Sequence, residues 1–163
     1  MHLRGKTMAE KQNASKNVGY DKVSTQQVLG DLYKNVTMCK HSIKVLLPHV
    51  EDSELTKTLI NQTDKYDDFC KRAEDLADRL KTEIEPVSKM LVCMSKTGIK
   101  MKMAKDNSQT NVLKVMLNGT FMGVIDLHIL LSHNKNAQSE VLLLGKEILN
   151  YQEERIEKLK QAL

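Results

Sequence analysis

The chain has 163 residues, of which 40% are hydrophobic and only 4% aromatic, and its formal net charge is +4. That length suits one domain with one core, and the residues that dominate the composition favour helices over strands. Acidic residues outnumber basic ones over residues 51–85, whereas lysines dominate residues 86–114. Neighbouring helices of opposite charge can neutralise each other, so no specific nucleic-acid partner is predicted.

The first 22 residues are polar and lack the apolar stretch of a secretory signal. We expect residues 1–22 to be a disordered tail or a remnant of cloning, followed by a single helical-bundle domain over residues 23–163. No run reaches the roughly 18 to 20 apolar residues of a membrane span, and the three cysteines have no metal-site spacing. The sequence therefore predicts a cytoplasmic protein with free thiols and no disulfides.

The first predicted helix begins at Ser24 or Thr25, either of which can act as N-cap residue, and ends before Pro48. Its apolar residues recur every three or four positions, which places them on one helix face. They are Leu29, Leu32, Val36, Cys39, Ile43 and Leu46. The segment is therefore expected to be an amphipathic helix with one buried face.

The second predicted helix runs from Asp52 or Ser53 to Ile84, because the residue that follows precedes a proline and is disfavoured in a helix. It is the longest helix, with a length of about 50 Å from the standard rise. Its short connection to the first helix forces an antiparallel hairpin. In this hairpin Cys39 is expected to face Gln62.

The segment Pro86–Lys105 has a proline at a favourable first helical position, and it is expected to be a shorter helix. Helices over residues 108–134 and 137–163 follow, joined by the turn-like sequence HNKN. They form a second predicted hairpin, in which Val124 faces Gly145. Each of the two hairpins has a self-consistent pattern of facing apolar residues.

Two antiparallel hairpins joined by a segment that travels the full length of the bundle give the connectivity of ferritin-like proteins. We therefore predict an all-α, ferritin-like bundle of five helices, with Pro86–Lys105 as the helical crossover. The alternative is an ordinary up-and-down bundle of five helices.

The chain also resembles an uncharacterised bacterial family of ferritin-like four-helix-bundle proteins. Two runs carry this resemblance, LYKNVTMCKHSIKVLLPHVED at residues 32–52 and MSKTGIKMKMAKDNSQTNVLKVMLNGTFMGVIDL at residues 94–127. The similarity extends over residues 28–163. It implies the ferritin-like fold and a bacterial source, and it carries no catalytic signature.

A di-iron site in such a bundle needs a Glu from each of two helices and a Glu-x-x-His motif from each of the other two. The chain contains no Glu-x-x-His motif. The inward rows carry amides and hydroxyl groups where carboxylates would be needed, at Gln62, Tyr66, Thr120 and Gln152. We therefore predict no metal ligand, no cofactor and no catalytic residue, which favours a protein that is not an enzyme.

The alternative is a ferritin-like, metal-dependent redox or iron-handling protein with an unconventional polar site. The residues that could form this site are Asp64, Asp67, Asp68 and His128. His128 and Asp126 do not make a ligand pair by themselves, because residues two apart lie on different sides of a helix.

Gly119 and Gly123 interrupt the helix predicted over residues 108–134, and each costs about 1 kcal/mol relative to alanine. They lie on one face, which Met116 continues. We expect another helix to pack closely on this face, either from the same chain or from a second subunit.

The crossover is rich in methionine and lysine, which form either an adaptable binding surface or core methionines beneath a solvated lysine face. We predict a protein that acts by association, as a homo-oligomer or with another protein as its partner. A third hypothesis is weak binding to an anionic surface through the Lys89–Lys105 face.

Overall fold

The structure, a computed structural model, describes residues 19–163. Within this range the chain forms five α-helices and one short 3₁₀ turn without any strand, which confirms the all-α prediction. The elements are α2 (Lys22–Leu46), η1 (Leu47–His49), α3 (Ser53–Leu80), α4 (Lys89–Lys105), α5 (Gln109–His133) and α6 (Ser139–Gln161). Residues 1–18 of the expected tail lie outside the described residues.

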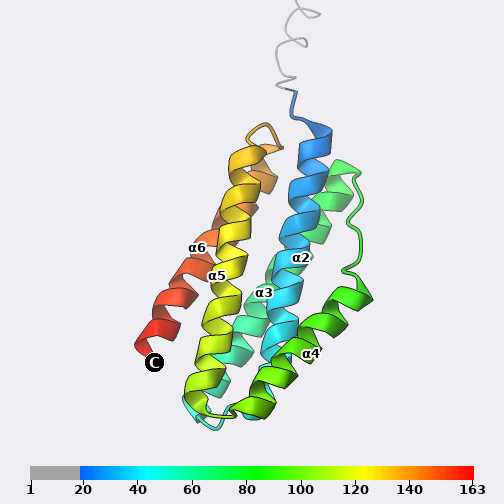
Figure 1. Ribbon diagram of the computed structural model, residues 1–163. Helices are drawn as coiled ribbons and strands as arrows, with labels where there is room; N and C mark the ends of the chain where they lie inside the picture. The colour runs from blue at the N-terminus through cyan, green and yellow to red at the C-terminus, as the bar shows by residue number, and fades with distance from the viewer. Residues whose placement is uncertain (1–18) are drawn as a thin grey trace, which may run out of the picture.

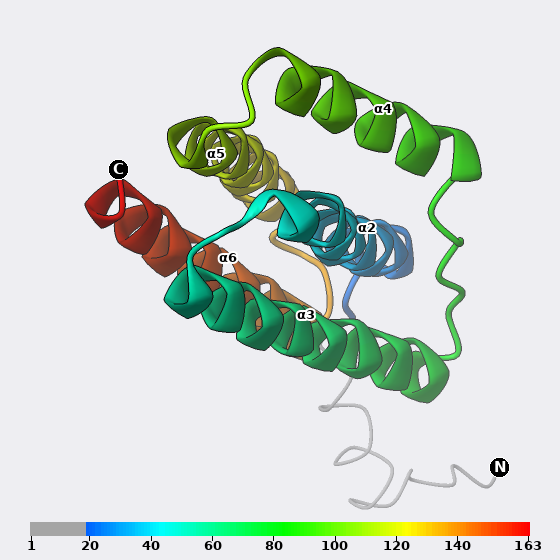
Figure 2. The same ribbon diagram turned by 90° about the horizontal axis from the view of Figure 1, so that it is seen from below.

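The helices form two antiparallel pairs, α2 with α3 and α5 with α6, which pack against each other (Figure 1). α2 contacts each of the other four helices. Between the two pairs the chain returns along the bundle through a non-helical segment, residues 81–88, and then through α4. Viewed along the bundle, α4 lies outside the four other helices, across α2 and α5 (Figure 2).

The first turn of α2 differs from the prediction. Asp21 is the N-cap residue in place of Ser24 or Thr25, and its carboxylate accepts hydrogen bonds from the Val23 backbone N–H at 3.0 Å and from the Ser24 hydroxyl at 2.6 Å. Thr25 is buried and links two helices, because its hydroxyl donates to the Asp21 carbonyl and accepts from the Gln138 backbone N–H at 2.9 Å. The start of α2 is thereby fixed to the start of α6.

The end of α3 lies four residues before the predicted end at Ile84. Lys81 adopts the left-handed conformation, with φ of 51° and ψ of 44°, and the Thr82 N–H donates to the Ala77 carbonyl at 3.0 Å. This capping geometry ends the helix at Leu80. The helix therefore ends before Pro86 can disfavour a helical backbone at the residue that precedes it. Ile84 still packs on the core from the non-helical segment, which explains why it continued the apolar pattern.

In the apolar row predicted for the first helix, Leu29, Leu32, Val36, Ile43 and Leu46 are all buried in the core. A fully buried side chain of this size stabilises the fold by about 1.5–3 kcal/mol. The largest fully buried apolar side chains on the four bundle helices are Tyr66, Phe69, Leu29, Leu32, Leu46, Leu59, Leu127, Leu144 and Ile148. The helical periodicity therefore identified the inward face of the first helix correctly.

The pairing within the first hairpin is shifted from the prediction. The side chain of Cys39 lies next to that of Tyr66, one turn beyond the predicted partner Gln62. Thr37 and Cys70, whose Oγ1 and Sγ lie 3.5 Å apart, show the same shift. The prediction assumed a tight turn, whereas the connection includes η1 and three further residues.

The second hairpin is shifted further. A Cβ atom at Gly145 would lie 2.7 Å from Cδ2 of Leu131, so Gly145 faces Leu131 and the predicted contact with Val124 is wrong. The connection over residues 134–138 is again longer than the predicted turn. Residues that share a face can be found from periodicity, but the level at which two helices meet depends on the path of the connection.

α4 and α5 both expose apolar side chains. α4 buries only Ile99 and Met103. Among the described residues α5 is the one helix long and apolar enough to cross a membrane, although it lies in the bundle with Val112 and Leu127 in the core. The sequence analysis did not identify this helix as long and apolar enough to cross a membrane, because polar residues interrupt its apolar run.

Replacing Lys81 with glycine is expected to stabilise the protein by about 1 kcal/mol, because glycine adopts the left-handed conformation without the steric cost of a Cβ atom. Lys71→Gly is the matched control. Lys71 is an exposed residue inside α3, so glycine there should destabilise by about 1 kcal/mol. Chemical denaturation of both variants measures the two effects, and a loss of stability in Lys81→Gly would contradict the described cap.

Candidate functional site

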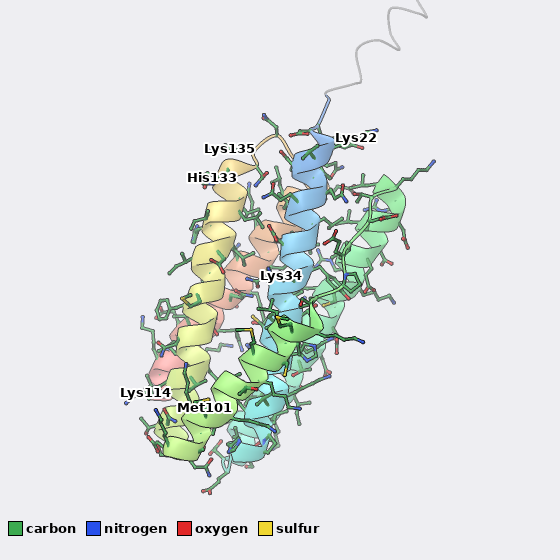
Figure 3. The ribbon with its side chains drawn as sticks, turned by 45° about the vertical axis from the view of Figure 1, so that its right-hand side comes forward. Lys22, Lys34, Met101, Lys114, His133 and Lys135 are labelled. Atoms are coloured by element: carbon green, nitrogen blue, oxygen red, sulfur yellow. The ribbon has the colours of Figure 1, made fainter. Side chains whose placement is uncertain are left out.

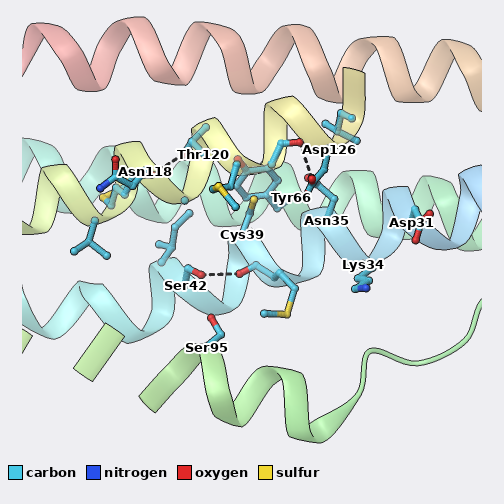
Figure 4. Close-up of a pocket in the computed structure, with 18 of the residues that line it drawn as sticks. Asp31, Lys34, Asn35, Cys39, Ser42, Tyr66, Ser95, Asn118, Thr120 and Asp126 are labelled. Carbon is cyan, nitrogen blue, oxygen red and sulfur yellow. Dashed lines mark hydrogen bonds between the residues drawn. The ribbon is translucent and has the colours of Figure 1, made fainter. Parts of the chain in front are cut away.

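A pocket of about 760 Å³ lies between α2, α4 and α5. Pockets of this volume are typical of small-molecule sites. Its walls carry apolar side chains from all three helices, and its floor reaches α3 through Gln62 and Tyr66 (Figure 4). The apolar lining residues are Met38, Cys39, Ile43, Leu46, Ile99, Val115, Met116, Met122, Leu127, Ile129 and Leu130.

Neutral polar groups form one part of the pocket floor. Tyr66 is fully buried beside Cys39, and its hydroxyl accepts a hydrogen bond from Nε2 of Gln62 at 3.3 Å. Burial raises the pKa of Cys39 to about 11 and raises the pKa of Tyr66 well above its usual range. Both groups are therefore protonated at neutral pH, and Cys39 is not present as a reactive thiolate.

An amide pair lies next to the pocket, which Asn35 lines and Gln152 does not. Nε2 of Gln152 donates to Oδ1 of Asn35 at 2.6 Å, and Nδ2 of Asn35 donates to the carbonyl of Gly123 at 3.2 Å. Gln152 is 0% exposed, yet its Oε1 has no hydrogen-bond partner. A buried acceptor without a partner costs about 1–3 kcal/mol.

The glycines of this region do not share one role. A Cβ atom at Gly123 would lie 3.1 Å from Oε1 of Gln152 and 3.2 Å from Nδ2 of Asn35. A Cβ atom at Gly119 would meet nothing within 4 Å. The expectation that another helix of the chain packs on both glycines is therefore wrong at Gly119, which borders the pocket. Met116 is buried in the core and also lines the pocket.

The residues considered for an unconventional polar site are not brought together. Asp67 pairs with Lys40 of α2 at 2.5 Å, and Asp68 pairs with Lys65 at 3.3 Å. His128 lies on α5, where its Nε2 is 3.0 Å from a carboxylate oxygen of Glu153 on α6.

Asp64 is exposed on α3. Over residues 19–163 no three His, Cys, Asp or Glu side chains lie close enough together to hold a metal ion.

The sequence identified four polar residues of the inward rows, Gln62, Tyr66, Thr120 and Gln152, and all four are buried. It missed Asn35, which completes the amide pair. Asn35 lies next to Val36 of the apolar row and four residues before Cys39. This spacing is the signal that could have placed it at the edge of the buried face.

These groups are uncharged donors and acceptors, and the pocket beside them is lined by apolar side chains together with the charged side chains of Asp31, Lys34, Lys102 and Asp126. Such an arrangement can bind a neutral hydrogen-bonding group attached to an apolar body. No match was found when the chain was compared with protein-family models, with curated proteins and with solved structures.

Gly119→Ala is expected to stabilise the protein by up to about 1 kcal/mol, because alanine favours the helix and its Cβ atom meets open space. Gly123→Leu is expected to destabilise it by about 1–3 kcal/mol, because the side chain would displace Asn35 and Gln152. Thermal melts of the two variants test the difference. Equal effects of the same sign would show that the two glycines have the same surroundings.

Proposed function

We propose that this chain is a non-enzymatic, ferritin-like helical-bundle protein that acts by association with a second copy of itself. The two antiparallel helix pairs and the connection that returns along the bundle support the ferritin-like assignment (Figure 1). The uncharged character of the pocket floor is consistent with a binding role.

An apolar ridge on α5 carries the proposal. Phe121, Ile125 and Ile129 are four residues apart and are 42%, 53% and 50% exposed, with Met122 beside them at 64%. Residues at this spacing form a straight ridge that packs into the groove of another helix. A ridge of large exposed side chains is typical of an interface rather than of a solvated face.

The ridge is complementary to itself. In an antiparallel pair of α5 helices centred on Ile125, Phe121 of one copy lies opposite Ile129 of the other, and the two-fold axis passes between the Ile125 residues. A symmetric contact of this kind is the commonest arrangement in homo-oligomers. The nearest lysine of α5, Lys114, is about 16 Å from the centre of the ridge along the helix axis, whereas Asp126 lies beside Ile125.

Ile125→Glu combined with Ile129→Glu is expected to convert the dimer into a monomer without loss of the fold, because both side chains are half exposed in the isolated chain. Ile60→Glu is the control, since Ile60 is 48% exposed on α3, away from the ridge. Analytical ultracentrifugation over a range of concentrations measures the association. A wild-type chain that remains monomeric at every concentration would overturn the proposal.

A second candidate function, binding to an anionic lipid surface, is favoured by the outer face of α4. Met90, Met94 and Met101 are exposed and lie within about 40° of one another around the helix axis. The lysines of α4 are at positions 89, 96, 100, 102 and 105, and none of them pairs with a carboxylate of the described residues. Apolar residues between lysines are typical of helices that lie on anionic membranes.

Other lysines adjoin this helix. Figure 3 shows Met101 of α4 with Lys34 of α2 and Lys114 of α5 in the same view, and both lysines belong to helices that α4 contacts. α2, α4 and α5 together carry ten lysines and only two acidic residues, Asp31 and Asp126. The positive charge of the protein is therefore concentrated on these three helices.

If α4 binds an anionic surface, the wild-type protein should sediment with phosphatidylserine-containing vesicles at low salt and be released by high salt. Lys96→Glu with Lys100→Glu should abolish this binding and leave self-association unchanged. Lys57→Glu with Lys71→Glu, which changes the net charge equally on α3, is the control. Equal loss in both double variants would show that net charge, and not this face, governs the binding.

A further inference from the structure

We infer that the dimer joined through the α5 ridge, and not the single chain, binds an anionic phospholipid bilayer, with α4 of both copies on the same membrane surface. The inference rests on the proposed self-association, and it makes the binding of α4 to anionic lipid a property of the dimer instead of an alternative to it. The position of α4 relative to the ridge carries it.

The ridge lies between two flanks of α5. On one flank, Met122 and the ridge residue Ile129 line the pocket that α5 shares with α2 and α4. On the other flank, Nε2 of His128 lies 3.0 Å from a carboxylate oxygen of Glu153 on α6. Viewed along the bundle, α5 lies between α4 and α6 (Figure 2). α4 and α6 are therefore on opposite sides of the ridge.

The symmetry of the dimer keeps these sides apart. The two-fold axis of an antiparallel α5 pair is perpendicular to both helices and to the line that joins them. Rotation about this axis turns each helix end for end and exchanges the two copies, but it leaves each flank of the ridge on the side where it was. Both α4 helices therefore lie on one side of the dimer, and both α6 helices lie on the other.

The apolar stripe of α4 points away from the bundle on this shared side. α4 buries Ile99 and Met103, and Ile99 lies about 180° around the helix axis from Met90. The side chains of Met90, Met94 and Met101 are exposed. In Figure 2, α4 lies outside α2 and α5, on the side of the bundle opposite to α3 and α6. The methionine stripes of the two copies therefore face the same way.

The charges of the helices follow the same division. α2, α4 and α5 carry ten lysines and two acidic residues, whereas α3 and α6 carry twelve acidic and nine basic residues. The dimer therefore has a basic side, which includes two α4 helices with five lysines each, and an opposite side that is acidic overall. An anionic bilayer attracts the first side and repels the second, which orients both α4 helices toward the lipid.

Two attachments on one rigid dimer bind more strongly than one. A single α4 helix offers the lipid three exposed methionines and five lysines, and the binding of such a helix scales with its buried apolar area and its charge. In the dimer the second α4 is already at the membrane when the first one binds, so it attaches without a second loss of translational freedom. Binding to the bilayer therefore depends on dimer formation and on the concentration of the protein.

Sedimentation of the full chain with vesicles of equimolar phosphatidylserine and phosphatidylcholine tests this dependence. Ile125→Gln combined with Ile129→Gln disrupts the ridge without a change in net charge and leaves α4 unaltered. This variant should be monomeric and should bind the vesicles at least about tenfold more weakly than the wild-type chain.

Ile60→Gln combined with Leu143→Gln is the matched control. These side chains are 48% and 57% exposed on α3 and α6, away from the ridge and from α4. The control variant should keep both the dimer and the wild-type affinity for the vesicles. A ridge variant that is monomeric, folded by circular dichroism and bound as tightly as the wild-type chain overturns the inference.

A fluorophore attached to Cys93 tests whether both α4 helices reach the lipid. Cys93 is the exposed cysteine of the described residues, and it lies on α4 about 60° around the helix axis from Met90. A quencher carried by the lipid should reach nearly every fluorophore of the bound dimer. The same fluorophore on Asn61→Cys of α3, in a chain with Cys93→Ser, should stay unquenched. Quenching of Cys93 that stops at about half would show that one α4 of each dimer faces away from the membrane, which overturns the inference.

Ultracentrifugation without lipid separates the two proposals. A wild-type chain that is monomeric at every concentration, or a ridge variant that remains dimeric, overturns the proposed ridge contact and the bivalent binding with it. A dimeric wild-type chain that does not sediment with the anionic vesicles, or that sediments equally with vesicles of phosphatidylcholine alone, overturns the bivalent binding and leaves the self-association standing.

Discussion

The hydrogen bond between the amides of Gln152 and Asn35 is the interaction on which the middle of the bundle depends. It joins α6 to α2, and the second bond of Asn35 extends the connection to the Gly123 carbonyl of α5. Nε2 of Gln152 also lies 3.5 Å from the thiol of Cys39, which is next to the buried Tyr66 of α3. Side chains and backbone from all four bundle helices therefore meet in one polar layer.

This layer sets the level at which the helices pack. Apolar rows alone would tolerate a shift of one turn, because one leucine can replace another at a similar volume. A shift of one turn would leave the buried amides and the phenol without partners, and each lost partner costs about 1–3 kcal/mol. Buried polar residues are known to fix register in this way in helical bundles, at a cost in stability.

The apolar periodicity of the sequence was sufficient to predict five helices and the inward face of α2, because burial of a helix face requires a spacing of three and four residues. It could not predict the facing pairs. The path of the connections decides them, and Cys39 and Gly145 accordingly meet Tyr66 and Leu131. The end of α3 was missed because Lys81 gives no sign in the sequence of its left-handed conformation.

The candidate site was predictable only in part. Four polar residues stood out because they interrupt apolar rows, but Asn35 lies beside a row and its role depends on the position of α6. The glycines were recognised as costly residues in a helix. Whether each faces a side chain or open space depends on the placement of α4, which has no strong amphipathic pattern and could not be positioned from the sequence.

The weak attachment of α4 has a consequence for the way the protein opens. The helix is anchored by the side chains of Ile99 and Met103, and the non-helical residues 81–88 precede it. Segments with few buried apolar contacts undergo local unfolding at free energies far below that of the whole domain. α4 can therefore detach while the polar layer and the other four helices remain folded, so that its amide hydrogens exchange with solvent earlier than those of α2.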